Sequence, residues 1–380
     1  MKVISGGITK PEGFRAHGMW SGIKRSQKKD LSLVVSDIPA TTASVYTQNS
    51  VVAAPITVCR RHGRNGRARA IIVNSGNANC FTGKQGYADA VCMAEACAAA
   101  LGIKATDVLV ASTGIIGKPL PIEKITTALP ALTAALSPAG GKAFAQGILT
   151  TDLVIKERTV RLTIGGKTVT IGGCAKGSGM IAPNMATMLG FITTDAAITG
   201  KMLKQALKEA NEDSFNCISV DGCMSTNDML TVLANGMAGN PVIDKPGKEY
   251  DAFRDALKDV CLDLAKKIVL DGEGATKFVT IHVKGTKTAK QAREIGLMVA
   301  NSMLVKTAIY GSNPNWGRVA AAVGALGIKG IEEDSLDISF SSFKKKDVSI
   351  TTTLQLGRAE ATVYTSDLTH EYIRINTEYN

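Results

Sequence analysis

The sequence predicts a mixed α/β protein built from two parts. Short apolar runs bounded by turn residues recur along the chain, and such runs are typical of buried strands. Longer segments carry apolar residues at helical spacing, most clearly from Tyr250 to Asp271. The end of the chain differs, because strand-forming segments dominate it. We therefore expect a larger domain over residues 1–280 and a smaller one over residues 281–380.

Strands and helices alternate in the first half of the chain. Four apolar stretches predict strands, at 31–36, 42–47, 69–74 and 107–112. Three Ala-rich or amphipathic stretches predict helices, at 87–101, 121–136 and 139–149. The alternating segments 153–164 and 167–173 are then expected to form a β-hairpin around Gly165 and Gly166.

The second half has longer helices and a strand-rich end. Amphipathic stretches predict helices at 198–215, 250–271, 289–310 and 319–326. Strand-forming stretches are expected at 188–192, 218–220, 278–283, 335–341, 347–355, 358–365 and 370–376. This change from helices to strands is the reason for a boundary near residue 280.

The composition supports a large folded core and argues against a membrane protein. Of the 380 residues, 45% are hydrophobic and only 5% are aromatic, so we expect an aliphatic core. No uninterrupted apolar run is long enough to span a bilayer. The amino terminus also lacks the apolar segment of a signal peptide. We therefore expect a cytoplasmic protein without a membrane partner.

The chain is basic, with 44 Lys and Arg against 33 Asp and Glu, a formal net charge of +11. The excess is concentrated in three stretches, at 24–29, 59–69 and 344–346. Nucleic-acid binding would call for interleaved aromatic residues that stack on bases, and these stretches lack them. Solvent-facing loops, or general attraction of small anions, explain the charge better. We expect no nucleic-acid partner.

The eight cysteines and four histidines do not form a metal-binding pattern. No two cysteines have the C-x-x-C spacing, and the histidines are isolated from one another. In a long cytoplasmic chain, cysteines most often pack as small apolar side chains. The sequence therefore predicts neither a metal site nor a disulfide framework.

One strand end and one helix end carry residues of interest. Thr113 and Gly114 follow the predicted strand 107–112, and a glycine there can turn a backbone N–H outward, as in an oxyanion hole. Glu273 lies between two glycines at a helix end, where the helix dipole disfavours a negative charge. Taken singly, each is explained as simply by a strand exit or a solvent-facing helix cap.

The segment 176–190 is the least ordinary stretch of the chain. Pro183 keeps Ala182 out of the helical region, so an irregular loop leads into the predicted strand 188–192. Thr187 stands at that entry. A threonine hydroxyl is a weak nucleophile without an adjacent base, but its own α-amine is such a base if the preceding bond is broken. On spacing alone, a structural glycine-rich loop is the simpler interpretation.

Together these motifs resemble those of the ornithine acetyltransferases, also called glutamate N-acetyltransferases. The resemblance extends over nearly the whole chain. It rests on eight short motifs in order, at 74–79, 111–114, 150–152, 176–189, 221–228, 272–278, 314–318 and 375–376. Each motif is weak alone, and their joint presence in this order is specific.

The resemblance implies a fold and a maturation step. The family fold is an αββα sandwich joined to a smaller α/β domain. The family's self-cleavage corresponds here to the bond between Ala186 and Thr187, which gives an α chain, 1–186, and a β chain, 187–380. The two chains stay together and assemble as α/β heterotetramers or larger.

The resemblance also implies an activity. Thr187 carries the acetyl group in a ping-pong transfer from N-acetylornithine to glutamate, a reaction of arginine biosynthesis. The oxyanion donors correspond to Thr113 and Gly114. The substrate contacts correspond to Thr150, Lys176, Thr187, Glu273 and Asn376. No cofactor is implied, although acetyl-CoA is a candidate second acetyl donor.

Two other functions are to be weighed against this one. The nearer is an N-terminal-nucleophile amidase or aminopeptidase of related fold, which would give the acyl group to water. The other is a non-enzymatic basic binding protein, which would remain a single uncleaved chain. A transfer assay and an intact-mass measurement distinguish the three.

Overall fold

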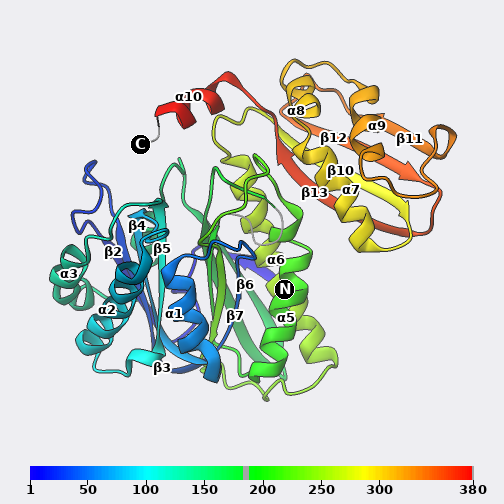
Figure 1. Ribbon diagram of the computed structural model, residues 1–380. Helices are drawn as coiled ribbons and strands as arrows, with labels where there is room; N and C mark the ends of the chain where they lie inside the picture. The colour runs from blue at the N-terminus through cyan, green and yellow to red at the C-terminus, as the bar shows by residue number, and fades with distance from the viewer. Residues whose placement is uncertain (183–187, 379–380) are drawn as a thin grey trace. The chain divides into compact units, whose positions relative to one another are not determined.

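The computed structural model describes residues 1–182 and 188–378, which form two compact units (Figure 1). The first unit contains Met1–Gly177, residues 188–214 and Ser225–Leu264. The second contains residues 178–182, Phe215–Met224 and residues 265–378. The main division therefore falls at residues 264 and 265, within a helix, whereas the composition of the chain had suggested residue 280. Two short segments from the middle of the chain also belong to the second unit.

A nine-stranded sheet forms the centre of the first unit. Its strands follow the order β1-β6-β7-β8-β9-β3-β4-β5, and β2 also pairs with β3. Their bounds are β1 (Lys2–Ile4), β2 (Phe14–Met19), β3 (Leu31–Tyr46), β4 (Arg67–Asn77), β5 (Val108–Ile115), β6 (Lys156–Ile164), β7 (Lys167–Lys176), β8 (Leu189–Thr194) and β9 (Met229–Ala234). The pairs β4–β5 and β8–β9 are parallel, and the other neighbours are antiparallel.

Strand β3 joins the two halves of this sheet. Residues 31–35 pair with β4, and residues 41–46 pair with β9, with a register shift between Val35 and Ala40. The sequence predicted two separate strands here, at 31–36 and 42–47. They are one continuous strand, because a bulge of this kind bends a strand without ending it.

Helices cover both outer sides of the sheet halves (Figure 1). On one side are α1 (Ala54–His62), α2 (Gly83–Leu101) and α3 (Ile122–Ala134); on the other are α5 (Gly200–Glu212) and the part of α6 (Lys248–Leu270) that belongs to this unit. The expected αββα sandwich is thereby confirmed. The short helix α1 was not predicted from sequence.

The core of the first unit is aliphatic, as the composition indicated. It includes Ile71, Ile72 and Val73 of β4, all fully buried. An aromatic pair adds to it: Phe144, from α4 (Gly141–Gly147), meets Phe191 of β8 edge-on, with ring centroids 5.6 Å apart. Such pairs contribute about 0.5–1.5 kcal/mol beyond the area that they bury. The predicted hairpin is also present, with Gly165 and Gly166 both at positive φ between β6 and β7.

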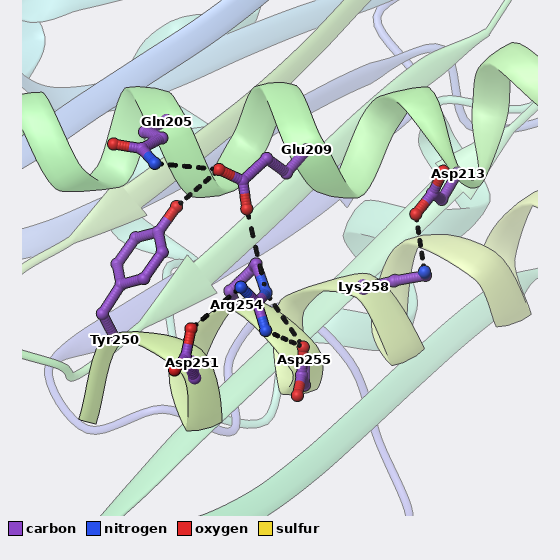
Figure 2. A network of polar contacts seen from close by, with 8 residues as sticks. All are labelled: Gln205, Glu209, Asp213, Tyr250, Asp251, Arg254, Asp255 and Lys258. Atoms are coloured by element: carbon purple, nitrogen blue, oxygen red, sulfur yellow. Dashed lines mark hydrogen bonds and ion pairs between the residues drawn. The ribbon is translucent and has the colours of Figure 1, made fainter. Parts of the chain in front are cut away.

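The outward faces of α5 and α6 are joined by a polar network (Figure 2). Arg254 forms ion pairs with Asp251 and Asp255 of its own helix and with Glu209 of α5. Lys258 pairs with Asp213 at 2.6 Å. These side chains are all partly exposed to solvent, so each pair contributes little to stability. The network fixes which face of each helix points to solvent, and the apolar faces are left to pack on the sheet.

The second unit contains a four-stranded sheet in the order β11-β12-β10-β13. The strands are β10 (Phe278–Thr286), β11 (Leu336–Phe340), β12 (Asp347–Leu354) and β13 (Ala359–Ser366). The helices are α7 (Ala289–Asn301), α8 (Met303–Tyr310), α9 (Trp316–Gly324) and α10 (His370–Glu378). Val283 and Ile350 of the sheet and Ile295 of α7 belong to one buried cluster.

Three sequence predictions in the later part of the chain were wrong. The segment 370–376 is the helix α10 and not a strand, because its apolar residues are too sparse to show either period clearly. The stretch 289–310 is two helices, since the Ser302 side chain accepts the Val305 N–H and begins a new helix. The segment 218–220 makes an isolated bridge, Ile218 to Tyr364, and no strand.

None of the helices within residues 1–182 and 188–378 is long and apolar enough to cross a membrane.

Candidate active site

The end of β5 carries Thr113 and Gly114 beside the end of β4. Gly114 has φ +133, and a Cβ on it would lie 2.4 Å from the backbone carbon of Gly76. Gly76 itself has φ +100. Only glycine fits at residue 114. Residues with a side chain rarely adopt this φ, and the neighbouring backbone leaves no room for a Cβ. The glycine therefore allows backbone N–H groups here to leave the regular hydrogen-bond pattern of the sheet, as an oxyanion site requires.

Buried amides brace the two strand ends. Asn74 accepts the Ser112 hydroxyl proton at 2.6 Å, and its own amide nitrogen donates to the Asn77 carbonyl at 2.9 Å. Asn227 donates to the carbonyl oxygens of Ala78 and Ser112, at 2.6 and 2.8 Å. These bonds connect the motif at 74–79 with the motif at 221–228. Their amides shape the site rather than react in it.

Lys176 ends β7 and reaches the Thr113 side chain. Its Nζ lies 3.3 Å from Thr113 Oγ1, and both residues are buried. In the sheet order β7 and β5 are far apart, so the contact is made across the two sheet layers. The structure thus brings together two residues that the sequence assigned to the site from separate motifs.

Asp152 is the carboxylate at the centre of this cluster. Its Oδ1 accepts the Lys156 ammonium and the Gly177 N–H, both at 2.7 Å, and its Oδ2 accepts the Thr150 N–H at 3.1 Å. Burial raises the pKa of Asp152, but the charges of Lys176 and Lys156 outweigh that effect and lower it to about 2. Asp152 is therefore ionised at neutral pH and fixes the turn that carries Thr150.

A third lysine, which sequence reasoning assigned only to a basic loop, also belongs here. Lys24 Nζ donates to the carbonyl oxygens of Leu149 and Lys29, at 2.7 and 2.9 Å. Burial lowers its pKa to about 8. It supports the turn at Thr150 from the other side. Neither Lys24 nor Lys156 stood out in sequence, whereas Asp152 could have been found, because it is part of the motif at 150–152.

The strand that follows the proposed nucleophile is fixed at its first residues. Met188 N donates to Asp228 Oδ1 at 3.0 Å, and Met188 O accepts the Met229 N–H at 3.2 Å. Asp228 is almost completely buried. Ala186 and Thr187, the expected cleavage site and nucleophile, lie outside the described residues.

The second unit holds Glu273 and Asn376. Asn376 Nδ2 donates to Glu273 Oε2 at 2.9 Å, and the Glu273 N–H donates to the Ser178 carbonyl at 3.0 Å. A Cβ on Gly179 would lie 2.2 Å from Glu273 Oε2, so a glycine allows the carboxylate to approach this segment. The pairing depends on α10, which carries Asn376 and which sequence reasoning took for a strand.

Asp221 anchors the segment that leads toward the cleavage site. It accepts the backbone N–H groups of Met180 and Ile181, at 2.6 and 2.9 Å, and the Tyr372 hydroxyl proton at 3.2 Å. The conformation of residues 180–182 is therefore set by a carboxylate from the motif at 221–228. Sequence reasoning gave Asp221 no role, although it stands at the start of that motif.

The expected site residues form two groups, each within one unit. Thr113, Gly114, Thr150 and Lys176 gather around Asp152 in the first unit, and Glu273 pairs with Asn376 in the second. Within the described ranges, no group of three or more His, Cys, Asp or Glu side chains is arranged to hold a metal ion. The chemistry available is that of hydroxyl, ammonium, carboxylate and backbone amide groups.

Comparison with known proteins decides the family. The model of the ArgJ family matches residues 15–380. This chain belongs to the ArgJ family. The resemblance inferred from the eight motifs is thereby confirmed.

Relatives in the ArgJ family match the chain end to end. The Arginine biosynthesis bifunctional protein ArgJ of Symbiobacterium thermophilum is 47% identical, with 100% of both chains covered. The protein of the same name from Gloeobacter violaceus is 47% identical over 99% of this chain and 98% of its own. Among solved structures, ornithine acetyltransferase complexed with ornithine from Mycobacterium tuberculosis is 39% identical, covers 48% of this chain and 97% of its own, and has a TM-score of 0.45.

Proposed function

We propose that the chain transfers the acetyl group of N2-acetyl-L-ornithine to L-glutamate in arginine biosynthesis, through an acetyl ester on Thr187. Membership of the ArgJ family supports this, as does the name of its relatives, bifunctional proteins of arginine biosynthesis. The structural observation that carries the proposal is the buried contact between Lys176 and Thr113 beside Gly114. It combines a cation and a hydroxyl with a glycine at φ +133, and such groups can stabilise a developing oxyanion.

The first step is cleavage of the chain by its own threonine. The Thr187 hydroxyl oxygen attacks the Ala186 carbonyl carbon and loses its proton. The Thr187 nitrogen takes up a proton as the C–N bond breaks, which leaves an ester. Water then hydrolyses the ester, giving the Ala186 carboxylate and restoring the hydroxyl. The new α-amine has a reference pKa of about 7.7–8.0, so a useful fraction is neutral and can act as a base near neutral pH.

The second step is acetyl transfer in two halves. Thr187 attacks the acetyl carbonyl of N-acetylornithine, the C–N bond breaks, and ornithine leaves with a proton on its amine. Glutamate then attacks the acetyl ester through its neutral amine and leaves as N-acetylglutamate. Backbone donors at Thr113 and Gly114 hold the oxyanion in both halves, where removal of one donor typically costs about 2.7–4 kcal/mol. A covalent intermediate of this kind gives ping-pong kinetics.

The charged residues suggest how substrates are recognised. Lys176 would attract a substrate carboxylate, and the Asp152 carboxylate, held by Lys156 and the Gly177 N–H, keeps that lysine in place. Glu273 would attract a substrate ammonium group. Thr150 and Asn376 would supply neutral hydrogen bonds. These roles follow from the polarity of each group.

Four further properties belong to this proposal. Acetyl-CoA would serve as a second acetyl donor, since the relatives are named bifunctional proteins. The cleaved α and β chains would assemble as a heterotetramer or larger. No resident cofactor is needed for the steps described, and the cytoplasm would be the site of action.

The experiment that tests the proposal follows a labelled acetyl group. Purified protein is incubated with N-acetylornithine carrying a ¹³C-acetyl group, with and without glutamate, and products are identified by mass spectrometry. Labelled N-acetylglutamate that forms only with glutamate is the expected result. Labelled acetate formed at the same rate without glutamate would identify a hydrolase, the amidase alternative. Replacing the labelled N-acetylornithine by acetyl-CoA with a ¹³C-acetyl group tests, in the same assay, whether acetyl-CoA also serves as acetyl donor.

A further inference from the structure

We propose that Lys24 is a positioning residue for the substrate contact at Thr150. Its ammonium group binds one end of the peptide unit between Leu149 and Thr150, and the Asp152 carboxylate binds the other end. The two charged groups together set the direction in which the chain enters Thr150. This inference rests on the proposed function, because it explains how a residue that would contact the substrate is oriented.

The peptide unit between Leu149 and Thr150 is bound at both ends by charged side chains. Lys24 Nζ donates to Leu149 O at 2.7 Å, and the Thr150 N–H donates to Asp152 Oδ2 at 3.1 Å. The carbonyl and the N–H belong to one planar group, so the two bonds restrict the orientation of that plane. Both bonds are charge-assisted, because the cation meets the oxygen and the carboxylate meets the N–H. A rotation of the plane would break both of them.

The loop that carries Lys24 is fixed mainly by Asp30. This aspartate is fully buried, and its carboxylate accepts the backbone N–H groups of Ser21 and Lys24, at 2.6 and 2.8 Å. The backbone of Asp30 is also hydrogen-bonded to β2 and β4, at 2.9 and 2.8 Å. The ammonium group adds one bond within the loop, to Lys29 O, and one bond to a segment 125 residues away. Its particular contribution is therefore the connection to the turn at Thr150.

The apolar stem of Lys24 packs beside the strand end that borders Gly114. A Cβ on Gly76 would lie 3.0 Å from Lys24 Cγ, so the stem is in close contact with this glycine. Gly76 in turn faces Gly114, whose added Cβ would lie 2.4 Å from the Gly76 backbone carbon. One side chain therefore contacts both the backbone beside the oxyanion glycine and the peptide unit before Thr150.

The ammonium group of Lys24 is partly buried, which has an energetic cost. Burial lowers the pKa of Lys24 to about 8, although the Asp30 carboxylate raises it. The Lys176 charge lowers this pKa further, and the Asp152 charge opposes that effect. The group is still mainly protonated at neutral pH, so its bond to the Leu149 carbonyl is charge-assisted. An apolar side chain would avoid the cost of burial but would lose this bond.

Lys24→Met separates the ammonium group from the stem that carries it. Methionine keeps an apolar side chain of similar length and removes the donor to Leu149 O. Lys124→Met is the matched control. Lys124 Nζ, from α3, donates to Gly22 O at 2.6 Å. Both substitutions thus remove a bond from an ammonium group to a backbone carbonyl at the same loop, but only Lys24→Met releases the turn before Thr150.

The first measurement does not depend on activity. Hydrogen exchange of the full-length protein, followed by mass spectrometry of overlapping peptides that contain Thr150, reports how well the Thr150 amide is protected. We expect this amide to exchange at least about threefold faster in K24M than in wild type, because release of the Leu149 carbonyl frees the peptide unit. Exchange in K124M should match wild type. Unchanged exchange in K24M would overturn the inference, whatever reaction the protein catalyses.

The second measurement asks whether Lys24 acts through Thr150. Thr150→Val keeps the shape of the side chain and removes its hydroxyl, and it is combined with K24M in a double-mutant cycle. We expect each single variant to lower kcat/KM for N-acetylornithine about tenfold, and both to change the same parameter, kcat or KM. The double variant should lose little more than T150V alone, whereas independent effects would multiply to about 100-fold. K124M should keep wild-type kinetics.

Three kinetic results would overturn the inference while leaving the proposed function in place. They are wild-type kinetics in K24M or in T150V, effects of the two variants on different parameters, and a double variant about 100-fold below wild type. If K24M does not fold, Lys24→Gln takes its place with the same expected results, because its shorter polar side chain lacks the charge. A wild-type protein that transfers no acetyl group would instead remove the proposed function itself, and the exchange measurement would still show whether Lys24 holds the peptide unit.

Discussion

Lys176 Nζ lies 3.3 Å from Thr113 Oγ1, and the two side chains come from strands at distant positions in the sheet order. The contact exists because the two halves of the nine-stranded sheet face one another across β3. A buried ammonium needs compensation, and Asp152 provides it. The site of the first unit is therefore a buried cluster beside the backbone of Gly114, in which the Asp152 carboxylate faces the charges of Lys176 and Lys156.

Replacing Lys176 tests the substrate-facing charge of this cluster. Lys176→Met keeps the length and apolar stem of the side chain but removes its ammonium group. We expect kcat/KM for N-acetylornithine to fall about 100-fold, a loss of about 2.7 kcal/mol of transition-state stabilisation. Lys290→Met, at an exposed lysine of α7, is the control. Initial rates over a range of N-acetylornithine concentrations measure the effect, and a fall of less than threefold would remove Lys176 from the site.

Replacing Gly114 tests the turned backbone. Gly114→Ala places a residue with a side chain at φ +133, and its Cβ would lie 2.4 Å from the backbone carbon of Gly76. Gly66→Ala is the matched control, since Gly66 has φ +69 but nothing within 4 Å of the added Cβ. We expect the control to cost about 1 kcal/mol in unfolding free energy and G114A to cost clearly more, with a large loss of kcat. Equal stability and activity in the two variants would show that residue 114 is not constrained in this way.

The pKa of Asp152 predicts how stability changes in acid. Its folded pKa of about 2 lies below the ordinary aspartate value of 3.8, so its contribution is fully present above about pH 5 and is lost as the pH falls toward 2. The shift corresponds to about 2 kcal/mol, of which about half should be lost at pH 3. Urea unfolding of wild type and Asp152→Asn at pH 6 and pH 3 measures it. The stability difference between them should shrink by about 1 kcal/mol at the lower pH, and a constant difference would contradict the assignment.

Glu273 tests the group in the second unit. Glu273→Gln keeps the side-chain shape and an acceptor for the Asn376 amide but removes the charge. We expect kcat/KM for N-acetylornithine to fall about tenfold or more, because a substrate ammonium loses its partner, while self-cleavage continues. Unchanged kinetics would exclude the carboxylate from substrate recognition. Intact-mass analysis of the same sample reports cleavage.

Local chemistry explains which parts of the fold were predictable from sequence. Buried strands such as β4 and long amphipathic helices such as α6 carry clear periodicity, and the hairpin at Gly165 and Gly166 has a distinctive turn. The continuity of β3 could not be predicted, because a bulge interrupts its register. The helix α10 was predicted as a strand because its apolar residues show no clear helical periodicity.

The site was predictable only where a residue belonged to a motif. Thr113, Gly114 and Lys176 stood at strand ends in recognisable sequences, and the structure brings them together. Lys24 and Lys156 could not be found in this way. Their importance comes from burial beside Asp152 and Leu149, which depends on tertiary packing and has no sequence period.

The intact mass of the purified chain tests self-cleavage before Thr187 directly. We expect two polypeptides in equal amounts from wild-type protein, one ending at Ala186 and one beginning at Thr187. Thr187→Ala should instead give a single chain of about 39.8 kDa without acetyl transfer. A wild-type protein that remains one 39.8 kDa chain while it transfers acetyl groups, or a Thr187→Ala chain cut at the same bond, would show that Thr187 is not the self-cleaving nucleophile.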